Sequence, residues 1–163
     1  MPLTKHQQEI RARCLYMAGW MSAHEWIEGY SMARPYARPE WRPSHYFAND
    51  CSGTLLLLYE WSGIRKPDGG HWGYGDTGTL ANAADAYHVP MNPNRWQPLD
   101  FVFYKEHSGP YRGGSGEHVT MLTHKENGHW YVVSHGSERG PKSLPYDYRG
   151  DFTAVRRYKI PRS

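Results

Sequence analysis

A cysteine in a short polar turn, directly before an apolar run, is the residue best placed for chemistry. Asp50-Cys51-Ser52-Gly53 leads into the run 54–61. If this run is a helix, Cys51 lies in its first turn, where unpaired N–H groups and the helix dipole favour an anion. A thiolate is such an anion and a nucleophile, and the same N–H groups could hold the oxyanion of an attacked carbonyl. The alternative is a buried structural cysteine.

Two of the ten histidines are expected to lie together at one edge of a sheet. His118 opens a predicted strand over 118–123, and His135 closes a return strand over 130–135. Asn127-Gly128 between them is a strong hairpin signal. Antiparallel pairing brings the start of one strand beside the end of the other. A helix that carries Cys51 and packs on this sheet can bring the thiol to His118.

Cysteine and two histidines then form a nucleophile, a base and a group that orients the base. His118 would take the thiol proton and return it to the leaving amine, while His135 would fix the tautomer of His118. Ordinary strand-end histidines are the alternative. A metal site built from His118, His124, His129 and His135 is the other competing use. These spacings match no standard ligand pattern and leave Cys51 unexplained, so we expect no metal and no cofactor.

The elements that position these residues divide into a helical first half and a sheet in the second. Thr4 can cap a helix through about Tyr16, Gly19 interrupts it, and a second helical piece follows over 22–28. Three prolines make 30–49 a long loop that delivers the chain to Cys51. The remaining predicted elements are a helix from Cys51 to about Ser62 that ends at Gly63, a short helix from Thr77 through Tyr87, strands over 99–104, 118–123, 130–135 and 152–158, and a glycine-rich loop over 108–116. Helices followed by an antiparallel sheet indicate the α+β class.

Length and charge bound the function classes. The 163 residues suit one domain, 1–163. A formal net charge of +3 is too small and too dispersed to indicate nucleic-acid binding. The longest apolar run, Leu55–Leu58, excludes a membrane span. We expect a monomer that binds no nucleic acid and does not insert into a membrane.

The two cysteines, Cys14 and Cys51, are not a disulfide framework of the secreted type. Cys14 lies among apolar neighbours in the first predicted helix, which indicates a core position. A single Cys14–Cys51 disulfide stays open, because spacing alone cannot show it. The polar residues 1–9 hold no apolar signal core, so we expect synthesis in the cytoplasm.

Four motifs in this order resemble the NlpC/P60 family of cell-wall cysteine peptidases. They are Asp50-Cys51-Ser52-Gly53, Leu99-Asp100-Phe101-Val102-Phe103-Tyr104, Glu117-His118-Val119 and Val132-Val133-Ser134-His135-Gly136-Ser137. The segments 75–80, 133–141, 144–151 and 156–158 are similar to the peptidase domain of endolysins from phages of mycobacteria and related actinobacteria. The resemblance covers roughly residues 30–159, and it implies a catalytic core over 30–160 with an N-terminal helical extension over 1–29.

The resemblance implies a papain-like fold in which N-terminal helices pack on an antiparallel sheet. It makes Cys51 the nucleophile, His118 the base and His135 the orienting residue. A tyrosine that supports the oxyanion is expected before the cysteine, and we favour Tyr30 over Tyr36 and Tyr46 because of its place in the loop. Asp50 and Ser52 are expected to line the site, where Asp50 either binds the free amine of a stem peptide or caps the helix.

The family typically cleaves the peptidoglycan stem peptide between D-glutamate and the diamino acid, here expected to be diaminopimelate. We therefore expect bacterial peptidoglycan as the partner, with a phage lysin made in the host cytoplasm and acting on the wall after release. Two alternatives stay open. One is an N-acetylmuramoyl-L-alanine amidase on the same Cys-His site. The other is a non-catalytic wall-binding module in which tyrosine and tryptophan stack on sugars.

Overall fold

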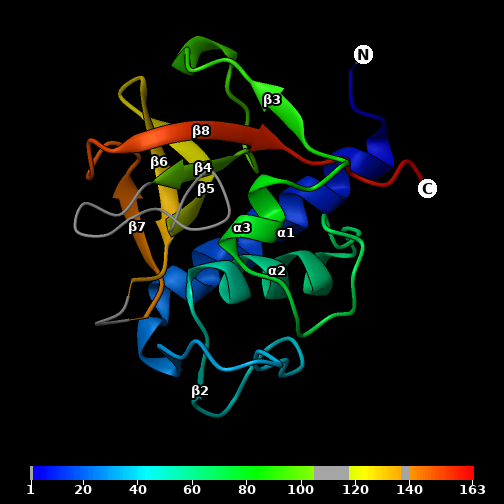
Figure 1. Cartoon of the computed structure of the whole chain (residues 1–163), viewed down its shortest axis with the longest axis vertical. Helices are drawn as coiled ribbons and strands as arrows, with labels where there is room; N and C mark the ends of the chain where they lie inside the picture. Colours follow the sequence, from blue (N-terminus) through cyan, green and yellow to red (C-terminus); the bar gives the residue numbers. More distant parts are fainter. Residues whose placement is uncertain (1, 105–117, 137–139) are drawn as a thin grey trace.

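The computed structural model describes residues 2–104, 118–136 and 140–163, and the predicted loop over 108–116 lies outside them. Helices alternate with short strands in the first half, and strands dominate the second (Figure 1). The elements are α1 (Lys5–Ala23), a 3₁₀ turn (Glu25–Ile27), β1 (Glu28–Gly29), β2 (Phe47–Ala48), α2 (Cys51–Ser62), α3 (Thr77–Ala81), β3 (Tyr87–Val89), a 3₁₀ turn (Pro93–Arg95), β4 (Phe101–Tyr104), β5 (His118–Glu126), β6 (His129–Ser134), β7 (Lys142–Pro145) and β8 (Phe152–Arg157).

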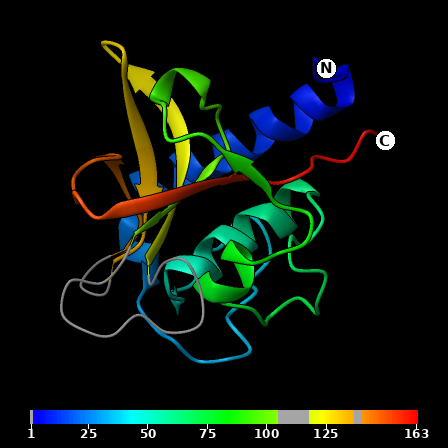
Figure 2. The same cartoon turned by 45° about the horizontal axis from the view of Figure 1, so that its top comes forward.

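Six strands form one antiparallel sheet in the order β3-β8-β4-β5-β6-β7. The hairpin between β5 and β6 turns at Asn127-Gly128, where both residues have positive φ, as predicted. The two-residue strands β1 and β2 pair in parallel outside this sheet. Helices α1 and α2 lie together on one side of the sheet (Figures 1 and 2). The predicted α+β class, with helices packed on an antiparallel sheet, is confirmed.

The main core lies between the helices and this face of the sheet. Cys14 and Met17 of α1, Leu55 of α2 and Phe101 and Val119 of the sheet belong to one buried cluster. A second buried cluster covers the other face of the sheet and includes Val102, Tyr104, Leu122 and Trp130. No helix within the described ranges is long and apolar enough to cross a membrane.

The helix ends follow from local chemistry. Thr4 caps α1 in a reciprocal hydrogen-bond pair with Gln7, as predicted. Asp50 caps α2 by accepting from the Gly53 N–H at 2.8 Å, and α2 ends at Gly63 in the left-handed region at φ 85°. These two caps fix the start and the end of the helix that carries Cys51.

Several predicted boundaries were wrong. Helix α1 runs through Gly19 to Ala23, because the apolar residues Met17, Ala18 and Met21 continue its buried face. Of the predicted helical piece over 22–28, the first two residues end α1, Glu25–Ile27 form a 3₁₀ turn, and Glu28 opens β1. Asp76 rather than Thr77 caps α3, which ends at Ala81, and Tyr87 opens β3, which pairs with β8. Strand β7 was not predicted.

Candidate functional site

Cys51 is the first residue of α2, as predicted, and its side chain lies at the interface between the helix and β5. Its exposed fraction is 7%. The thiol lies 3.6 Å from the Thr77 hydroxyl and forms hydrogen bonds with the backbone of Val119 and of Ser52. Val119 follows His118 in β5. The nucleophile candidate and the base candidate are therefore brought to the same end of the sheet.

The thiol is held neutral rather than as a thiolate. Burial raises the pKa of Cys51, and the negative charge of Asp50 raises it further. Hydrogen bonds with Thr77 and with the backbone act in the opposite direction but are the smaller effects. The thiolate expected at the helix N-terminus is thus opposed by desolvation, so attack on a carbonyl needs a base that removes the proton.

His118 lies half-buried at the start of β5, and one of its ring nitrogens is engaged. Its Nε2 lies 3.0 Å from the Ser134 hydroxyl, which lies 3.2 Å from the Tyr148 hydroxyl. Burial, the larger cause, and repulsion from the Arg149 charge together lower the pKa of His118 to about 4. The ring is therefore neutral at pH 7 and can accept a proton. Hydrogen bonds between the described residues do not join His118 to the Cys51 thiol.

His135 lies beyond the end of β6 and is buried, with its side chain turned toward β1. Its Nε2 donates to the Gly29 carbonyl at 2.6 Å and lies 3.9 Å from the Glu28 carboxylate. Its ring packs edge-to-face against Tyr30, with the ring centroids 5.8 Å apart. The histidines are near enough for the charge of His135 to lower the pKa of His118. The structure shows no His118–His135 hydrogen bond within the described ranges.

Asp50 and Ser52 stand on either side of Cys51, and Arg34 already engages their polar atoms. The Arg34 Nη2 donates to both carboxylate oxygens of Asp50, at 3.2 and 2.9 Å, and to the Ser52 hydroxyl at 3.2 Å. The Asp50 Oδ1 also accepts from the Gly53 N–H and from Ser52. Of the two roles considered for Asp50, helix capping is observed, and the amine of a substrate would have to compete with Arg34.

The three candidate tyrosines lie in different surroundings. Tyr30 is 37% exposed and contacts His135, so it lies next to the predicted histidine pair. Tyr36 is buried, and the charges that influence its pKa are those of Glu60, Arg38 and Asp68 rather than that of Cys51. Tyr46 is 69% exposed, with its hydroxyl against Gly29. Tyr30 remains the candidate that best fits the predicted place.

Cys14 is a core residue, as predicted. It is fully buried in α1, its thiol faces the Leu58 carbonyl at 4.0 Å, and burial raises its pKa to about 12. Both cysteines are free. Leu58 lies seven residues after Cys51 in α2, about 10 Å along the helix axis, which is too far for a disulfide between the two cysteines.

Two other members of the histidine set considered for a metal face acidic residues at the far end of the β5–β6 hairpin. His124 lies 3.0 Å from Glu126, and His129 lies 2.8 Å from Asp147. In the part of the chain that the structure describes, three or more potential metal ligands do not gather at one place.

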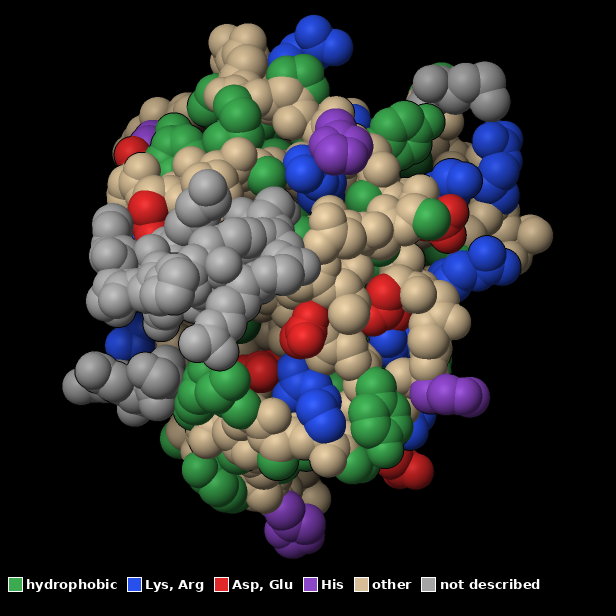
Figure 3. Space-filling model, in the orientation of Figure 1, with side chains coloured by type: hydrophobic (Ala, Val, Ile, Leu, Met, Phe, Trp, Pro, Cys, Tyr) green, Lys and Arg blue, Asp and Glu red, His purple; other side chains and the backbone are tan. Residues whose placement is uncertain are grey.

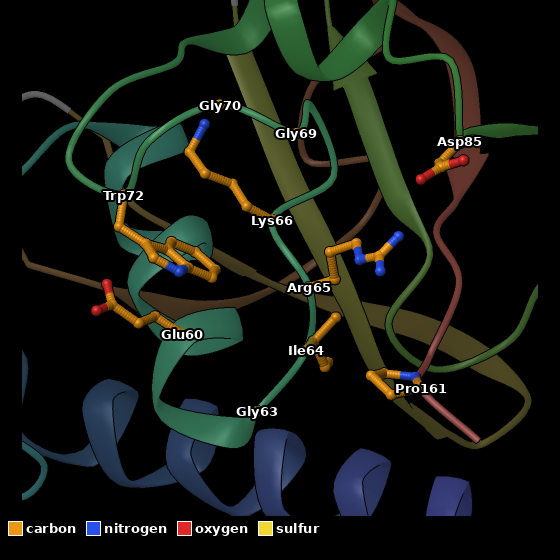
Figure 4. Close-up of a pocket in the computed structure, with 10 residues that line it drawn as sticks. All are labelled: Glu60, Gly63, Ile64, Arg65, Lys66, Gly69, Gly70, Trp72, Asp85 and Pro161. Carbon is orange, nitrogen blue, oxygen red and sulfur yellow. The ribbon is translucent and has the colours of Figure 1, made fainter. Parts of the chain in front are cut away.

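A hollow of about 600 Å³ lies at the opposite end of α2 from Cys51 (Figure 4). Figure 4 shows Glu60 and Gly63 at the helix end, with Arg65 and Trp72 on the loop that follows. A second hollow, of about 590 Å³, lies where the two chain ends meet and includes Arg11, Arg157, Lys159 and Arg162. Lys and Arg side chains gather along that edge of the molecule in Figure 3. Neither hollow includes a predicted catalytic residue.

Four residues of the site were not predicted in these roles: Arg34, Thr77, Ser134 and Tyr148. Ser134 is the one with a usable sequence signal, because it stands one residue before His135 in a strand, and side chains alternate between the two faces. Arg34, Thr77 and Tyr148 lie in or beside loops, where pairing depends on tertiary structure.

The sequence matches no protein-family model and no curated protein. The structure is similar to the crystal structure of an NlpC/P60 family protein from Bacillus cereus ATCC 10987, with a TM-score of 0.55 and 20% sequence identity. The match covers 93% of this chain and 40% of the other. The chain therefore has the fold of an NlpC/P60 protein and spans less than half the length of that neighbour.

Proposed function

We propose that this chain is a cysteine endopeptidase of bacterial peptidoglycan, of the NlpC/P60 type. The observation that supports it most directly is the position of the Cys51 thiol. The thiol sits at the start of α2 and is hydrogen-bonded to the backbone of Val119, directly after His118. The fold shared with an NlpC/P60 protein and the four ordered sequence motifs point to the same chemistry.

In the proposed reaction, His118 acts as a general base toward a neutral thiol. The His118 ring accepts the Cys51 proton as sulfur attacks the scissile carbonyl carbon, which forms a tetrahedral intermediate. The proton then passes to the leaving amine, and an acyl-enzyme remains on sulfur. Water then gives one proton to His118 and attacks the thioester carbonyl. The C–S bond breaks, the new carboxylate is released, and His118 returns its proton to the Cys51 sulfur.

The start of α2 offers a place for the oxyanion. Gly53 and Thr54 direct their N–H groups to Asp50, whereas the Cys51 N–H makes no hydrogen bond with any described residue. A backbone N–H at a helix N-terminus stabilises the negative charge that develops on the attacked carbonyl. Tyr30 is the proposed second donor, by the resemblance to the family.

The finer assignment also rests on the resemblance. We propose the bond between D-glutamate and diaminopimelate as the target and a phage lysin as the biological setting. The lysin would be a monomer that is made in the host cytoplasm and reaches the wall after release.

The test is turbidity loss of purified actinobacterial peptidoglycan under reducing conditions. Cys51→Ala and His118→Ala are each expected to abolish clearing while circular dichroism shows an unchanged fold, and prior alkylation with iodoacetamide should also abolish it. His88→Ala is the matched control, because His88 is an exposed histidine in β3. Clearing that survives in Cys51→Ala would refute the proposal, and wall binding without clearing by any form would indicate a binding module.

Mass analysis of the released ends identifies the bond. A new amine on the diamino acid indicates the endopeptidase. N-acetylmuramic acid with a free lactyl carboxylate, no longer joined to a peptide, indicates the amidase alternative. Both reactions use the same thiol and base, so the variants above do not separate them.

A further inference from the structure

The hydrogen bonds of His118 point to an orienting residue other than the predicted one. We propose that Ser134, supported by Tyr148, orients His118 for its reaction with Cys51, and that His135 instead anchors β6 to β1. This inference rests on the proposed thiol chemistry and names a positioning residue within it.

The register of the sheet separates the two histidines. Met121 lies opposite Val133 and Leu122 opposite Val132 in the β5–β6 pair. Residues opposite each other point to the same face, and neighbours along a strand point to opposite faces. Continued to the strand ends, this register places His118 on the face of Ser134 and His135 on the other.

The ring contacts agree with this assignment to faces. His118 contacts Tyr104, whose ring centroid lies 5.7 Å away and which belongs to the core cluster of the far face. His135 contacts Tyr30 and donates to the Gly29 carbonyl on the helix side of the sheet. His118 and His135 lie at the same edge of the sheet, as the hairpin predicts, but their side chains point to opposite faces.

The hydroxyl chain has the geometry that an orienting group needs. The Ser134 hydroxyl, in a side chain that is nearly buried, lies 3.0 Å from the His118 Nε2 and 3.2 Å from the Tyr148 hydroxyl. With Nε2–H donating to Ser134, the ring carries its proton on Nε2 and leaves Nδ1 as the base. Nδ1 forms no hydrogen bond with any described residue, and it is the ring nitrogen left to act as the base.

Tyr148 also responds to the nucleophile. Charge on Cys51 is one of the smaller causes that raise the pKa of Tyr148, after burial. The Ser134 hydroxyl can accept from His118 while it donates to Tyr148 or accepts from it. The hydroxyl pair therefore fixes the ring plane without adding a charge.

A spectroscopic experiment tests the geometry without any substrate. An imidazole N–H is observed in a ¹H–¹⁵N correlation spectrum when a hydrogen bond protects it from exchange with water. Protein with ¹⁵N-labelled histidine should show such a resonance for the His118 Nε2–H, identified by its loss in His118→Gln. The resonance should disappear in Ser134→Ala and persist in His135→Asn. Its absence from the wild type, persistence in Ser134→Ala or loss in His135→Asn would each overturn the proposal.

Wall hydrolysis tests the role. Ser134→Ala is expected to lower kcat by about tenfold with KM unchanged, the size expected for one hydrogen bond to a group that becomes charged. The acid limb of the pH profile should shift as well, and Ser134→Thr should restore most of the loss because it keeps the hydroxyl. Ser143→Ala, in the exposed part of β7, is the matched control. An unchanged kcat in Ser134→Ala would overturn the proposal.

The two experiments distinguish failure of the proposed function from failure of the proposed role of Ser134. If the wild type clears no wall material but the Nε2–H resonance behaves as described, the peptidase function fails and the proposed role of Ser134 in it falls too, while the hydrogen-bond geometry stands. If clearing depends on Cys51 and His118 but Ser134→Ala changes neither the resonance nor kcat, the function stands and Ser134 is not the orienting residue.

Discussion

At the residue scale, Glu28 is an acidic group buried beside the candidate site. Its side chain is fully buried, the Thr54 hydroxyl donates to Oε1 at 3.0 Å, and Oε2 has no partner in the described ranges. Burial raises the pKa of Glu28 to about 8, although Thr54 and Asn49 lower it by hydrogen bonds. At neutral pH the carboxyl group is therefore mostly protonated.

Replacement of this group by a neutral isostere should stabilise the protein at alkaline pH. The folded state retains a proton on Glu28 that the unfolded state loses above a pKa near 4.5, so the contribution of Glu28 to stability falls as pH rises from about 4.5 to 8. The Gln side chain in Glu28→Gln does not titrate. The free energy of unfolding of this variant, relative to that of the wild type, should therefore rise by at most ~1.4 kcal/mol per pH unit in that range. Urea denaturation at pH 5, 6.5 and 8 measures this, and a constant difference would contradict the raised pKa.

The sequence indicated the positions of the candidate residues in the fold better than their contacts. Cys51 could be placed because an aspartate and a serine before an apolar run define a helix start locally. The Ser134–His118 contact depends on strand parity, which the hairpin argument left out. The Arg34–Asp50 contact joins positions 16 residues apart across a proline-rich loop, and no local pattern encodes that closure.

At the element scale, Arg34 fastens the long loop over 30–49 to the start of α2. Besides Asp50 and Ser52, it donates through Nε to the Gly75 carbonyl at 2.8 Å and through Nη1 to the Met32 and Ala33 carbonyls. One side chain thus connects the loop before Cys51, the helix that carries it and the segment before α3. These contacts of Arg34 hold the start of α2, which carries Cys51, between the loop over 30–49 and the segment before α3.

Loss of this contact should cost stability because it leaves the largely buried Asp50 with fewer donors. Arg34→Ala is expected to lower the free energy of unfolding by about 2 kcal/mol, less than for a fully buried pair because the arginine is 21% exposed. Asp50→Asn keeps a capping side chain, so the double variant should lose less than the sum of the single losses. Arg38→Ala is the control, since the Arg38–Glu60 pair is exposed and contributes little. Urea denaturation measures these losses. If Arg34→Ala and Arg38→Ala lose the same free energy of unfolding, Arg34 does not fasten the loop to α2.

The elements that were predicted correctly are those with local signals at both ends. Helix α2 has Asp50 and Gly63, and the β5–β6 hairpin has Asn127-Gly128. The predicted strand from Leu99 begins only at Phe101, because Leu99 has a φ of 77° that a strand cannot hold. Strand β7 is short, and it forms through its pairing with β6. The sequence of β7 alone does not predict that pairing.

At the scale of the whole molecule, the sheet and the N-terminal helical segment meet in close backbone contact. Residues of α1 share a buried cluster with α2 and the sheet, so the segment 1–29 packs into the main core. The predicted division into an extension and a catalytic core stays a prediction. One such contact is at Gly140, just before β7. A Cβ there would lie 1.8 Å from the Glu25 carbonyl oxygen and 2.7 Å from that of Glu28.

This contact predicts opposite outcomes for the same substitution at two glycines. Gly140→Ala should lower the free energy of unfolding by about 3 kcal/mol, because the new methyl group meets backbone that cannot move without shifting the turn after α1. Gly19→Ala, on the exposed face of α1 with no atom within 4 Å, should raise it by ~0.5–1 kcal/mol through helix propensity. Urea midpoints of the two variants measure both effects. An unchanged midpoint for Gly140→Ala would mean that the sheet and the helical segment can separate at this point, and β1, which accepts from His135, would then be free to move relative to β6.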